Sequence, residues 1–72
     1  MGKYSMEEEK KFYESFYGKI VKVITKTGEV DGRIEKVRTD LEDWKCYIYV
    51  RDNDKNLLKI DHDDIASVKV TY

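Results

Sequence analysis

The sequence predicts a mainly β protein: a single domain over residues 1–72, with an N-terminal α-helix followed by a five-stranded, strongly bent antiparallel barrel of the SH3-like or Sm-like type. Three observations predict this fold class. Residues 5–17 combine a capping pattern with an apolar stripe, which is typical of an amphipathic helix. From Gly18 on, β-branched residues and period-two alternation favour strands. Closure into a barrel would remove sheet edges that a 72-residue chain cannot otherwise protect.

The helix is expected over about residues 5–17. Ser5 and Glu8 form a capping-box pattern, in which the serine oxygen accepts from a free helix amide and the glutamate bonds the amide of the cap. Gly18 is a typical residue for the end of a helix. The aromatic side chains between them form the apolar stripe that would cover an open barrel end: Phe12, Tyr13, Phe16 and Tyr17.

The barrel is expected over about residues 19–72. Thr27 and Gly28 predict the turn of a first hairpin, and Gly32 indicates a bend or bulge in its second strand. The clearest strand is 44–52, in which apolar and polar residues alternate. Turn residues at 52–56 then separate it from the last two strands. The predicted core residues are Ile34, Trp44, Cys46, Ile48, Val50, Val68 and Val70.

Charge is segregated along the chain, although the net charge is only −1. Residues 18–38 carry six basic and three acidic side chains, whereas residues 40–64 carry four basic and eight acidic ones. Because opposite charges attract, the two segments could meet between copies, and we expect a homo-oligomer. The single cysteine excludes an internal disulfide, and the charged N-terminal residues do not resemble a signal peptide. We therefore expect a cytoplasmic protein without membrane contact.

The hairpin glycines, the G-x-I-x-x-V run at 32–37 and the DDIASV run at 63–68 resemble the Sm-like family, which includes bacterial host-factor RNA chaperones and Lsm proteins. The resemblance implies barrels that pair edge strands into rings and bind RNA through loops facing the pore. Those loops would correspond to residues 40–43 and 61–64, which are acidic here. The sequence also departs from the family pattern after Val37, where Arg38 replaces the expected aspartate.

Two groups of residues are candidates for binding RNA. The polar positions of strand 44–52 combine aromatic rings with cations, as base stacking and phosphate contacts require. The basic hairpin could supply further phosphate contacts. The alternatives are that the tyrosines pack on a half-buried sheet face and that the cations are ordinary solvated residues. The RNA-binding candidates are Lys22, Lys26, Arg33, Lys36, Arg38, Lys45, Tyr47, Tyr49 and Arg51.

An acidic surface is the basis of the alternative function. Its carboxylates could mimic nucleic acid and bind a basic protein surface, as a small regulatory inhibitor would. We expect neither a metal nor a cofactor, because consecutive acidic residues rarely converge on one ion and no known ligand spacing is present. We also expect no catalysis, because a nucleophile and a base must be held together, whereas Cys46 falls on the apparent core face and His62 in a distant loop. The candidate residues for a protein partner are Asp40, Asp43, Asp61, His62, Asp63 and Asp64.

Overall fold

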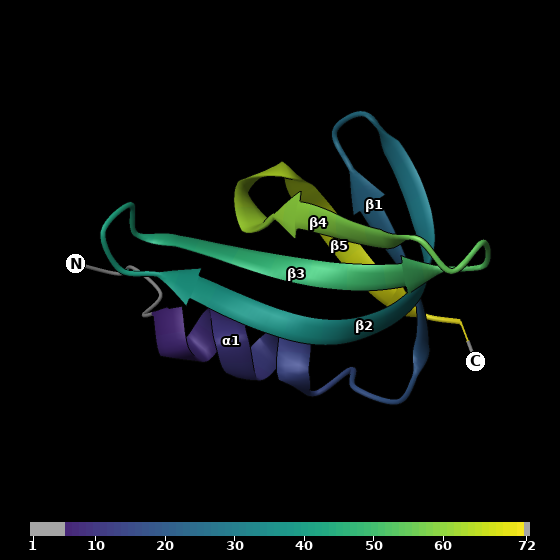
Figure 1. Cartoon of the computed structure of the whole chain (residues 1–72), viewed down its shortest axis with the longest axis horizontal. Coiled ribbons are helices and arrows are strands. Elements are labelled where there is room, and N and C mark those ends of the chain that lie inside the picture. Colours follow the sequence, from purple (N-terminus) through teal and green to yellow (C-terminus); the bar gives the residue numbers. More distant parts are fainter. Residues whose placement is uncertain (1–5, 72) are drawn as a thin grey trace.

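The fold is a helix packed against a five-stranded antiparallel sheet, which confirms the predicted mainly β class (Figure 1). The computed structural model describes residues 6–71, so the predicted cap at Ser5 lies outside the described residues. The elements are α1 (Met6–Glu14), β1 (Ile20–Thr25), β2 (Gly28–Asp40), β3 (Lys45–Asp52), β4 (Leu57–Asp61), the 3-10 helix η1 (His62–Asp64) and β5 (Ile65–Val70).

The helix ends at Glu14, three residues earlier than the predicted end at residue 17. Beyond it the backbone tightens into turns, in which the N–H groups of Phe16 and Tyr17 bond carbonyls three residues back. The Ser15 hydroxyl donates to the Phe12 carbonyl at 2.6 Å and so competes with helical hydrogen bonding. Gly18 has a left-handed backbone with φ 80°, but it lies at the end of these turns and does not end the helix itself.

The long strand β2 connects the two halves of the sheet, whose order is β4-β3-β2-β1-β5. Its first half pairs with β1 and its second half with β3, and Gly32 pairs with both neighbours. A Cβ atom at Gly32 would lie 2.1 Å from the Arg51 carbonyl oxygen, so only glycine permits this approach. The predicted bulge occurs a little later, where the register with β3 shifts between Ile34 and Lys36. β2 therefore curves along its length (Figure 1).

The predicted closure into a barrel is wrong. Strands β4 and β5 are the two edges of the sheet, and each is hydrogen-bonded to a single neighbouring strand. The 3-10 turn of η1 separates β4 from β5, and β5 pairs with β1 rather than with β4. The helix contacts β2 and β3 and contributes the buried Tyr13 to the core. The helix therefore covers part of the core of the open sheet with Tyr13.

The core confirms most of the predicted residues and corrects three of them. Trp44 is 65% exposed, because β3 begins only at Lys45 and Trp44 lies in the preceding turn with φ 55°. Val70 is 48% exposed at the end of the edge strand β5, and Val68 is only partly buried. The buried residues are Tyr13, Val21, Val23, Ile34, Val37, Cys46, Ile48, Val50 and Ile60.

Candidate nucleic-acid interface

The outer face of the sheet presents two tyrosines from β3. Cys46, Ile48 and Val50 are buried, so the strand alternation turns Tyr47 and Tyr49 to the opposite, outer side. Directly opposite residues in antiparallel strands share a face. The register pairs Tyr47 with Arg38, and it pairs Tyr49 with Lys36 on one side and Lys59 on the other. We call Lys36, Arg38, Tyr47, Tyr49 and Lys59 the tyrosine face.

The three cations of the tyrosine face have no acidic partner within residues 6–71. Lys59 places its Nζ atom 4.2 Å from the centroid of the Tyr47 ring, in a cation–π contact. The Tyr49 ring has no such contact in the same part of the chain. Both tyrosines line an open hollow of about 500 Å³, together with Arg38, Lys59 and the segment 39–42. The surface therefore combines accessible aromatic rings with cations that form no ion pair among the described residues.

Lys45 and Arg51 of β3, which also belong to the predicted RNA-binding set, are paired within the protein. Lys45 Nζ lies 3.2 Å from Asp61 Oδ2 and 3.9 Å from Asp63, and the hydrogen bond with Asp61 raises the pKa of Lys45. Arg51 donates to both carboxylate oxygens of Glu35 at 3.1 Å, which raises the pKa of the guanidinium and lowers the pKa of Glu35. These charges are already compensated, so they offer less to a phosphate than the cations of the tyrosine face.

The basic hairpin is not continuous with the tyrosine face. Lys22 on β1 pairs with Glu29 at 3.5 Å, and Lys26 is exposed in the β1–β2 turn. β2 separates these two residues from the tyrosines of β3. Arg33 is exposed on β2 opposite Arg51. Sequence reasoning missed Lys59, although its position next to the buried Ile60 in β4 could have indicated that it faces outward.

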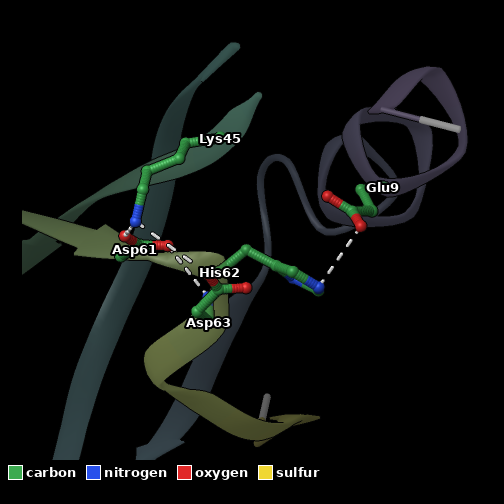
Figure 2. Close-up of polar contacts among 5 residues, drawn as sticks. All are labelled: Glu9, Lys45, Asp61, His62 and Asp63. Carbon is green, nitrogen blue, oxygen red and sulfur yellow. Dashed lines mark hydrogen bonds and ion pairs between the residues drawn. The ribbon is translucent and has the colours of Figure 1, made fainter. Parts of the chain in front are cut away.

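Part of the predicted acidic surface is engaged in contacts within the protein: Asp61 and Asp63 with β3, and His62 with the helix (Figure 2). Asp61 Oδ1 accepts the Asp63 N–H at 2.9 Å and caps η1, and Oδ2 accepts from Lys45. Desolvation opposes ionisation of Asp61, but these hydrogen bonds prevail and lower its pKa. His62 Nε2 lies 3.4 Å from Glu9 Oε2 of α1, and its Nδ1 is hydrogen-bonded to Tyr13 at 2.5 Å. Three of the predicted contact residues, Asp61, His62 and Asp63, therefore have structural partners.

The β2–β3 loop carries the more accessible part of the acidic set. Asp40 Oδ1 accepts the backbone N–H groups of Glu42 at 3.0 Å and Asp43 at 3.2 Å, which fixes the turn. Asp43 and Asp64 are exposed and form no ion pair within the described residues. The same loop exposes two large apolar side chains: Leu41 is 71% exposed and Trp44 is 65% exposed.

Among the described residues no group of three or more His, Cys, Asp or Glu side chains could hold a metal ion, and no helix is long and apolar enough to cross a membrane. Cys46 is 2% exposed, and burial raises the pKa of its thiol to about 11. Because the thiolate is the nucleophilic form, this cysteine behaves as a core residue.

No family model matches the chain, and neither a curated protein nor a solved structure is significantly similar to it. The resemblance to the Sm-like family therefore stays a prediction.

Proposed function

We propose that this chain is a non-enzymatic module that binds single-stranded RNA on the tyrosine face. The observation that carries the proposal is the position of Tyr47 and Tyr49 among three cations that have no acidic partner within residues 6–71. Aromatic rings stack on bases of any sequence, and cations follow the phosphate backbone. The binding would be weak and salt-dependent, because few cations contribute and acidic loops lie at the end of β2 and after β4.

The two tyrosines would have different roles. Within the described residues the Tyr49 ring makes no ring or cation contact and could receive a base, whereas one face of the Tyr47 ring is in contact with Lys59. The ammonium group of Lys59 is thus held over the aromatic surface, where it would meet a phosphate adjacent to the stacked base. Arg38 and Lys36 lie on β2 beside the same rings and would contact the neighbouring phosphates.

Self-association belongs to the same proposal. The two edge strands β4 and β5 expose backbone groups that are ready to pair with another chain. We propose that copies assemble through these edges, as the resemblance to Sm-like proteins implies. Sedimentation velocity over a range of protein concentrations tests this, with a concentration-dependent increase in mass as the expected result. A monomer at all concentrations would contradict it without affecting RNA binding by the single chain.

A specific observation favours a second function, the binding of a basic protein. The β2–β3 loop exposes Leu41 and Trp44 on either side of Glu42 and Asp43, and exposed tryptophans are frequent at the centres of protein interfaces. The flanking residues Glu42 and Asp43 would complement Lys and Arg residues around an apolar pocket in the partner. In this function RNA does not bind, and Trp44→Ala abolishes the protein complex.

The experiment is a titration of a fluorescent, unstructured RNA of about ten nucleotides, which is within the size range of single-strand binding sites. We expect Tyr49→Ala to weaken binding by about tenfold, because base stacking on an aromatic side chain contributes about 1 to 3 kcal/mol. Tyr17→Ala is the matched control, since Tyr17 is 43% exposed but lies outside the tyrosine face. Wild-type-like binding by Tyr49→Ala would contradict the proposal. No detectable binding by the wild type would favour the protein partner.

A further inference from the structure

We infer that the hollow over the tyrosine face prefers a guanine base, and that Glu42 recognises it; this inference rests on the proposed function. The hollow has a volume of about 500 Å³, which suits a small ring system. Tyr47 and Tyr49 supply aromatic surface, Arg38 and Lys59 supply positive charge, and the segment 40–42 supplies carboxylates. A surface built only to follow a phosphate backbone would not include the carboxylates, because they repel it.

The turn of the β2–β3 loop fixes Glu42 at the hollow. Asp40 Oδ1 accepts the Glu42 N–H at 3.0 Å, so the backbone of Glu42 is held while its side chain lines the hollow. The Glu42 carboxylate has no hydrogen bond and no ion pair within residues 6–71. Both of its oxygens are therefore available to a ligand. Asp40 is less available, because its Oδ1 already accepts two backbone N–H groups.

The chemistry of the base edges makes guanine the best match. An ionised carboxylate only accepts hydrogen bonds. The Watson–Crick edge of guanine presents two adjacent donors, N1–H and the N2 amino group, which can bond both oxygens of one carboxylate. Adenine, cytosine and uracil each present an acceptor next to the donor on this edge, which would face a carboxylate oxygen. Stacking on Tyr49 would hold guanine in the hollow. Repulsion between the Glu42 carboxylate and an acceptor atom would disfavour the other three bases.

The test compares four RNAs of about ten uridines, in which one central position is guanine, adenine, cytosine or uracil. We expect the wild type to bind the guanine RNA about tenfold more tightly than the others, as one good bidentate contact allows. Glu42→Gln should remove most of this preference. It should also leave unchanged or strengthen binding to the other three RNAs, because a negative charge is lost near the phosphates.

A matched variant separates recognition from charge. Asp43→Asn removes the same charge from the same loop and should keep the guanine preference, because Asp43 does not line the hollow. Equal binding of all four RNAs by the wild type would overturn the inference and leave the proposed function intact. A guanine preference that persists in Glu42→Gln would overturn it as well. No binding of any of the four RNAs would overturn both.

Discussion

The salt dependence of RNA binding can be calculated from the number of cations on the tyrosine face that form no ion pair within the described residues. Lys36, Arg38 and Lys59 have no acidic partner in the described part of the chain, whereas Lys45 and Arg51 are paired with carboxylates. Each phosphate neutralised on a single strand contributes a slope of about −0.7 to the logarithm of affinity against the logarithm of salt concentration. Three cations therefore give a slope of about −2, and binding should weaken about twentyfold between about 50 and about 200 mM salt.

Replacing Lys36 and Arg38 together with alanine leaves one of these cations. The slope should then fall to about −0.7, so that the same change in salt weakens binding only about threefold. The assay is fluorescence anisotropy with labelled RNA at several salt concentrations. Lys69→Ala is the control, because Lys69 lies on β5 at the far edge of the sheet and its loss should leave the slope unchanged. A wild-type slope near −5 would refute the reasoning, because it would require the paired cations and the hairpin to contact phosphates too.

Three further predictions concern stability and are measured by urea unfolding. Ile48→Ala should cost about 2 to 5 kcal/mol, because Ile48 is fully buried and the substitution leaves a cavity; a loss below about 1 kcal/mol would contradict its place in the core. Gly32→Ala should cost about 3 kcal/mol, since its Cβ would meet the Arg51 carbonyl. Gly18→Ala should cost only about 1 to 2 kcal/mol, for the left-handed backbone at this position, because a Cβ atom there would meet no atom within 4 Å. Equal costs of Gly18→Ala and Gly32→Ala would contradict the steric account. Tyr13→Phe should cost about 1 to 2 kcal/mol by removing the hydrogen bond to His62. Unchanged stability would show that this hydrogen bond does not stabilise the packing of α1 against η1.

Local patterns in the sequence predicted most elements of the fold. The alternation after Lys45 correctly separated Ile48 from Tyr47 and Tyr49, because a strand turns successive side chains to opposite faces. The same alternation wrongly included Trp44, because it continues into a turn where the backbone has φ 55°. Barrel closure could not be predicted reliably, since the pairing of edge strands depends on long-range geometry that period-two patterns do not contain.

The candidate site was predicted in part. Sequence indicated the tyrosines and their neighbouring cations, but it did not show which charges are compensated. Lys45 and Asp61 are 16 residues apart and Arg51 and Glu35 are also 16 apart, so their ion pairs depend on how β3 pairs with its two neighbours. The same cross-strand pairing brings Lys59 to the tyrosines.

The most direct test of RNA binding on the tyrosine face is an NMR titration of the isotope-labelled protein with a short, unstructured oligouridine containing one guanine. The account predicts that the largest chemical-shift changes occur at Lys36, Arg38, Tyr47, Tyr49 and Lys59, and at Glu42, which would contact the guanine. It also predicts only small changes along β5 and α1, which lie outside this face. The largest changes at residues 61–64 or along β5, or no changes at a large excess of RNA, would contradict it.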